Sequence, residues 1–118
     1  MKNILFLFCV ILTGCYYDKE EELYGAATCD ATNVQYSTTI TGLLNTYGCV
    51  GCHSGSAPSG NISLQDFTGV KTTAQNGKLL GSINHSSGFS PMPKGGGKMS
   101  ACEISKIKAW IDAGAVNN

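Results

Sequence analysis

The sequence lacks several features that would point to common functional classes. It contains no arginine, and its eight lysines are balanced by eight carboxylates. Nucleic-acid-binding proteins usually carry a basic surplus, so this balance argues against such a partner. The longest apolar run, Ile4 to Leu12, is well short of the roughly 20 residues that cross a bilayer. This run is therefore not expected to be a membrane-spanning helix.

The short apolar run instead resembles part of an export signal. It follows the positive residue Lys2 and leads to Leu-Thr-Gly before Cys15, a pattern similar to the cleavage site of bacterial lipoproteins. We therefore expect residues 1–14 to be a signal peptide and Cys15 to carry acyl chains that anchor the protein to a membrane. The alternative is an ordinary secretory signal or an uncleaved anchor.

Charge is unevenly distributed after the lipidation site. Residues 15–33 are acidic with few apolar side chains, a composition that cannot bury itself and predicts a lipidated tether. Residues 34–118 are long enough for one domain, and they contain more lysines than carboxylates. These lysines could face an acidic partner, although a solvated surface is the simpler explanation. The expected location is the cell envelope, facing the periplasm or the cell surface.

The central motif of the domain is Cys49-Val50-Gly51-Cys52-His53. The pattern C-x-x-C-H is the attachment signature of haem c. Two thiols at this spacing can form thioether bonds to the two vinyl groups of haem, and the adjacent histidine can ligate the iron. We therefore predict one covalent haem, held by Cys49 and Cys52, with His53 as the proximal iron ligand.

Two other uses of these cysteines fit less well. A zinc site would need a second pair of ligands at similar spacing, and the chain has none. A thioredoxin-like redox pair would be expected in a βαβ unit, which the sequence pattern does not indicate.

The remaining cysteines can be assigned by elimination. Of six cysteines, Cys9 lies in the apolar run and Cys15 in the lipidation motif, which leaves Cys29 and Cys102. Because the envelope is oxidising, we expect these two to form a disulfide. Two buried, unpaired thiols are the alternative.

Helical periodicity surrounds the central motif. Before it, apolar side chains recur on one helical face from Tyr36 to Tyr47, with Ser37 or Thr38 as the cap and Gly48 as the end. The face comprises Tyr36, Ile40, Leu43, Leu44 and Tyr47.

Two further helices are predicted after the Ser- and Gly-rich loop at 54–61. The first has Ser63 and Asp66 as candidate caps and ends at Gly77, and one or two more turns precede Asn84. Its inward-facing residues would be Phe67, Val70 and Ala74.

The last helix is the best defined by its sequence. Ser100 and Glu103 form a capping box, and Gly114 provides the C-terminal stop. The apolar face comprises Ile104, Ile107 and Ile111, with Trp110 beside them.

A second candidate ligand lies between the helices. Met92 is flanked by two prolines and followed by three glycines, so its backbone is stiff and the following chain can pass close to a macrocycle. This favours Met92 as the distal iron ligand. Met99, which also fits a core methionine, and His85, in a polar loop, are alternatives, and an open iron is a further one.

Together these elements resemble a small class I cytochrome c over roughly residues 29–118. The resemblance rests on the haem motif, on Met-Pro-x-Gly-Gly at 92–96, and on Trp-Ile-Asp-Ala-Gly at 110–114. It implies an all-α fold with three to four helices around one haem, and a helix contact between Gly42 or Leu43 and Trp110.

The resemblance also implies electron transfer between protein partners, with His53 and Met92 as axial ligands. The protein would not be an enzyme and would have no small-molecule substrate. The alternatives are a haem site for gas or peroxide, or a haem module docked to a larger envelope oxidoreductase.

Overall fold

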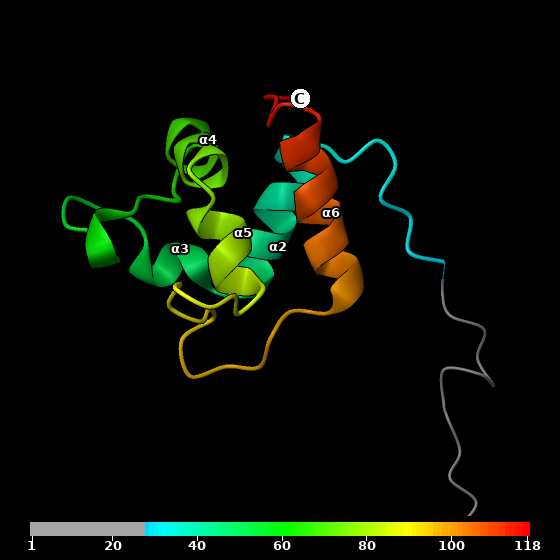
Figure 1. Cartoon of the computed structure of the whole chain (residues 1–118). Coiled ribbons are helices and arrows are strands. Elements are labelled where there is room, and N and C mark those ends of the chain that lie inside the picture. The colour runs from blue at the N-terminus through cyan, green and yellow to red at the C-terminus, as the bar shows by residue number, and fades with distance from the viewer. Residues whose placement is uncertain (1–27) are drawn as a thin grey trace, which may run out of the picture.

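The computed structural model describes residues 28–118, and in this part of the chain all regular structure is helical (Figure 1). The signal peptide, Cys15 and most of the acidic tether lie outside the described residues. None of the helices described is long and apolar enough to span a membrane. The elements are η1 (Tyr36–Ile40), α2 (Thr41–Thr46), α3 (Cys49–Cys52), η2 (Ser59–Asn61), α4 (Phe67–Gln75), α5 (Lys78–Ile83) and α6 (Ala101–Asp112). The predicted all-α class is confirmed.

The first helix consists of η1 and α2. Its inward face is as predicted, with Ile40 and Leu44 buried and the other three members half-buried. The predicted cap is wrong, because the helix already begins at Tyr36. The backbone N–H of Tyr36 donates to Oδ1 of Asn118 at 2.8 Å, and that of Ser37 to the Asn118 carbonyl at 2.9 Å. A residue distant in sequence thus satisfies donors that a local side chain was expected to satisfy.

Helix α4 is capped by Asp66, whose carboxylate accepts the N–H of Gly69 at 2.8 Å; Ser63 does not provide the cap. Position 69 requires a glycine, because a Cβ here would collide with the carbonyl oxygen of Ser63. Val70 and Ala74 are buried, as the periodicity predicts. Gly77, in the left-handed conformation, separates α4 from α5.

Helix α6 packs against η1 and α5. Its capping box is present as predicted, and Ile104, Ile107 and Trp110 are buried. The Trp110 ring stacks on Tyr36 with centroids 5.8 Å apart, and its Nε1 donates to the Val116 carbonyl at 2.9 Å.

The predicted contact is between Trp110 and either Gly42 or Leu43. The Gly42 alternative is not observed, whereas Leu43 is half-buried against the core that includes Trp110. Gly42 is exposed, and a Cβ at this position would meet nothing within 4 Å. An aromatic pair takes the place of a close backbone approach, because Tyr36 fills the space beside the indole ring.

The start of α6 is tied to two distant segments. Cys29 and Cys102 are joined by a disulfide, with Cα atoms 5.4 Å apart. The hydroxyl of Tyr47 donates to Oε2 of Glu103 at 2.6 Å. The chain before the first helix and the end of that helix therefore both meet the first turn of α6.

Candidate functional site

The two thiols of the central motif lie on one turn of helix. Gly48, with φ 65°, ends the first helix and allows the chain to turn into α3. Cys49 and Cys52 then occupy positions i and i+3 of α3, which face the same side of a helix. Neither forms a disulfide; Cys49 is half-buried and Cys52 is exposed. Burial raises the pKa of the Cys49 thiol.

His53 follows directly and is oriented by a backbone carbonyl. Its Nδ1 lies 3.1 Å from the carbonyl oxygen of Ile62. Since a carbonyl can only accept, Nδ1 must carry the proton, and a neutral imidazole then has its lone pair on Nε2. Histidines that ligate metals are usually held in this way, with the other ring nitrogen donating to a carbonyl or carboxylate.

The backbone around His53 is fixed as well. The His53 carbonyl accepts the N–H of Leu64 at 2.7 Å, and Leu64 is buried in the core. The loop at 54–61 therefore returns to the helix turn from which it started, and Ile62 is held beside the imidazole.

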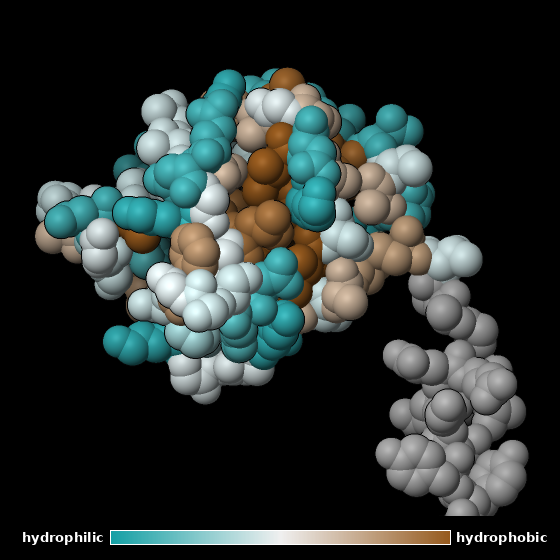
Figure 2. Space-filling view, viewed as in Figure 1, coloured by the Kyte–Doolittle hydropathy of each residue, from teal (hydrophilic) through white to brown (hydrophobic). Residues whose placement is uncertain are grey.

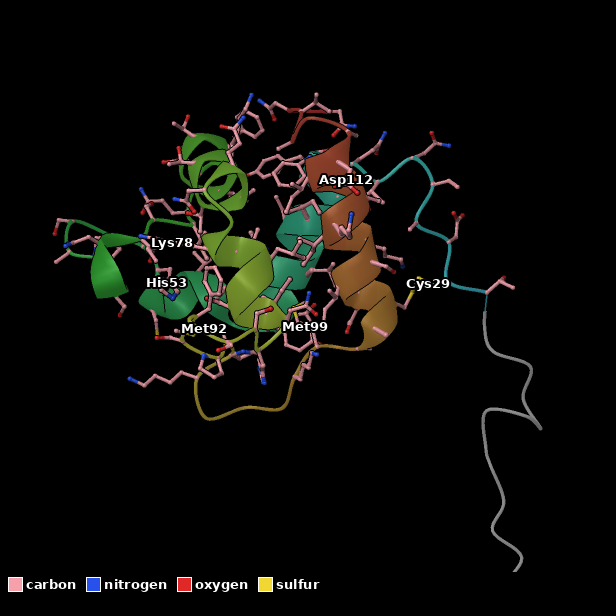
Figure 3. The ribbon with its side chains drawn as sticks, viewed as in Figure 1. Cys29, His53, Lys78, Met92, Met99 and Asp112 are labelled. Carbon is pink, nitrogen blue, oxygen red and sulfur yellow. A yellow bond between two sulfur atoms is a disulfide. The ribbon has the colours of Figure 1, made fainter. Side chains whose placement is uncertain are left out.

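Met92 is anchored to the end of α5 through its backbone. Its N–H donates to the carbonyl of Ser82 at 3.1 Å, and its carbonyl lies 3.0 Å from Nε2 of His85. The peptide bond to Pro93 is cis, and the Met92 side chain is half-buried. Figure 3 shows His53 and Met92 on the flank of the domain away from α6.

The two alternative ligands have other surroundings. Met99 is 5% exposed and belongs to the hydrophobic core, beside the start of α6 (Figure 3). This matches its interpretation as a core methionine. His85 is exposed, and its Nε2 is engaged with the Met92 carbonyl.

Several apolar side chains of the domain are incompletely covered. Val50, Ile62 and Leu80 are half-buried, and Phe89 is 39% exposed. The Phe89 ring lies flat against Gly81, where a Cβ would come within 2.6 Å of ring atoms. Figure 2 shows apolar side chains gathered in the middle of one face, between α4 and α5 on one side and α6 on the other.

The described residues include several groups that could hold a metal cofactor. They are the two unpaired thiols, the His53 imidazole, whose Nδ1 is engaged, and the Met92 side chain, whose backbone is bonded at both polar groups. Within residues 28–118, no group of three or more His, Cys, Asp or Glu side chains is arranged to hold a metal ion.

Comparison with known proteins adds no assignment. No protein-family model, no curated protein and no solved structure matches this chain.

Sequence reasoning missed three groups that position the site. They are the carbonyl of Ile62, the carbonyl of Ser82 and the imidazole of His85. Backbone carbonyls carry no sequence signal, because every residue has one. The spacing from His85 to Met92 gave no helical or strand periodicity that would have paired the two residues.

Proposed function

We propose that the protein is a lipid-anchored, mono-haem c-type cytochrome that transfers single electrons in the bacterial cell envelope. The observation that supports this best is the arrangement at α3. Two unpaired thiols on one helical turn are followed by an imidazole whose Nδ1 is held by the Ile62 carbonyl. This combination is what covalent haem attachment with histidine ligation requires.

Haem c bound here would supply one-electron exchange between Fe(II) and Fe(III). Cys49 and Cys52 would hold it covalently, and His53 Nε2 and Met92 Sδ would be the iron ligands. A thioether ligand raises the potential, and two filled axial positions suppress chemistry on small ligands. Val50, Ile62, Leu80 and Phe89 would exclude water, and their low dielectric disfavours the extra positive charge of the oxidised state.

The first test is whether the exported protein carries covalent haem. The full-length chain, produced in a host that matures c-type cytochromes, should show a c-type spectrum in both oxidation states. The haem should stay with the polypeptide under denaturing conditions. The Cys49→Ser, Cys52→Ser double variant should lose the haem, while Cys29→Ser, Cys102→Ser should retain it. A colourless protein whose Cys49 and Cys52 react freely with an alkylating reagent would rule out the proposal.

The second test separates electron transfer from a gas or peroxide site. Met92→Leu and Met99→Leu are matched, volume-conserving changes. Of these two variants, we expect only Met92→Leu to abolish thioether ligation and to make the reduced protein bind carbon monoxide readily. Strong carbon monoxide binding by the wild-type protein would indicate an open iron instead. A spectrum unchanged by Met92→Leu would move the distal ligand elsewhere.

The anchor and the partners follow from the same proposal. Cys15→Ser should release the protein from the membrane fraction without changing its spectrum. Donor and acceptor would be redox proteins of the envelope. Chemical crosslinking in intact envelopes distinguishes a free shuttle, which gives transient adducts, from a module docked permanently to a larger oxidoreductase, which co-purifies in fixed stoichiometry.

A further inference from the structure

A one-turn clamp at the end of α5 holds the candidate distal ligand. The N–H of Met92 donates to the Ser82 carbonyl at 3.1 Å, and the Met92 carbonyl lies 3.0 Å from Nε2 of His85. Both polar groups of this residue are therefore bonded to the segment Ser82–His85. The His85 N–H in turn donates to the Ser82 carbonyl at 3.1 Å, so the two ends of the clamp are joined.

The conformation of His85 is suited to this contact. His85 has φ 56°, in the left-handed region that side chains other than glycine rarely adopt. This turn ends the helix and points the chain back along it, with Ser86 N–H donating to the Gly81 carbonyl at 2.9 Å. His85, the residue in this unusual backbone conformation, is thus the one whose side chain reaches the Met92 carbonyl.

The position of the proton in the hydrogen bond between His85 and Met92 decides whether His85 can also ligate a metal. The Met92 carbonyl is an acceptor only, so Nε2 of His85 must be the donor. A nitrogen that carries a proton has no lone pair for a metal. In this arrangement His85 cannot ligate iron through Nε2 while it also holds Met92.

We infer that His85 is a positioning residue, which holds the Met92 backbone so that the thioether is presented to the iron. The inference rests on the proposed function. A methionine side chain has several rotatable bonds and loses considerable entropy on ordering. Fixing the backbone at both the N–H and the carbonyl leaves only the side chain to be ordered when the Sδ–iron bond forms.

The test uses the full-length holoprotein and three variants. His85→Ala removes the donor, and His85→Gln retains an N–H donor on a side chain of similar length. Ser87→Ala is the matched control, since Ser87 is exposed in the same loop and is not part of the clamp. Two quantities are measured on the oxidised protein: the far-red thioether-to-iron absorption band, and the affinity for imidazole or azide, which displace the methionine.

We expect His85→Ala to weaken the band and to raise the affinity for the exogenous ligand about 2- to 12-fold, the factor expected for one lost hydrogen bond. His85→Gln should restore much of the difference, and Ser87→Ala should resemble wild type. Far-ultraviolet circular dichroism checks that each variant folds.

Three outcomes have distinct meanings. Unchanged ligand affinity and band in His85→Ala, with methionine ligation intact in the wild type, would overturn the positioning role alone. Complete loss of low-spin ligation in His85→Ala, together with no effect of Met92→Leu, would make His85 the ligand and also overturn it. A wild-type protein without haem would instead refute the proposed function.

Discussion

Replacing Cys29 and Cys102 together by serine should lower the stability of the protein substantially while leaving its site intact. The bridge spans 73 positions, and the chain-entropy model assigns about 4 kcal/mol to a loop of that length. Small domains are stable by only about 5–15 kcal/mol in total. Cys29 is exposed and Cys102 half-buried, so the substitutions themselves remove little packing.

The folded state of the variant should otherwise be preserved. The first turn of α6 keeps its capping box and the hydrogen bond from Tyr47 to Glu103. The bridge also lies on the opposite side of the domain from His53 and Met92 (Figure 3). The spectrum of the proposed haem should therefore be the same in the variant and in the wild type.

Urea denaturation of the full-length holoprotein measures the effect. With a denaturant slope of about 1–2 kcal/mol per molar for a domain of this size, the midpoint should fall by about 2–4 M. A thiol reductant, which opens the disulfide, should lower the urea midpoint of the wild type to that of the variant. For this comparison both proteins are measured in the same reducing buffer, so that any bound iron has the same oxidation state in each. Equal urea midpoints for the variant and for the wild type with its disulfide intact would refute the predicted stabilisation. A large spectral change in the variant would refute the prediction that the site is preserved.

Three other changes follow from contacts in the folded domain. Gly69→Ala should destabilise by about 1–3 kcal/mol or more, because its Cβ would meet the Ser63 carbonyl. Gly42→Ala, in open space on α2, should stabilise by up to about 1 kcal/mol because alanine is the better helix former; thermal unfolding of the pair checks both signs, and equal effects would contradict the assigned contact. The hydrogen bond from Tyr47 holds the pKa of Glu103 below its ordinary value of 4.5, so its contribution to stability is complete above that pH and lost as the pH falls through the lowered pKa. Glu103→Gln should therefore flatten the loss of stability below pH 4.5, and an unchanged acid limb in urea titrations from pH 6 to 2 would argue against this role.

Local patterns predicted the helices well because their signals lie within a few residues. Asp66 and Gly69, or Ser100 and Glu103, are three positions apart, so their capping bonds are visible in the sequence. The inward face of the first helix follows from the spacing of its apolar residues alone. The candidate thiols and His53 lie within the stretch 49–53, and this part of the site needs no tertiary information to be recognised.

Contacts that join distant segments were not predictable in the same way. Asn118 bonds the start of the first helix from 82 positions away, and no pattern couples the two. Trp110 could have met several residues of the first helix, and only the crossing of η1 with α6 selects Tyr36.

The sequence by itself determined the helical class, the capped starts of α4 and α6 and the residue types proposed to hold a haem, because each of these depends on neighbours along the chain. Only the tertiary structure decided how those residues are oriented. The Ile62 carbonyl selects the tautomer of His53, and Ser82 with His85 anchors Met92, while Met99 is buried in the core. Two of these three holding groups are backbone carbonyls, which every residue has, and folding alone brings all three to His53 and Met92.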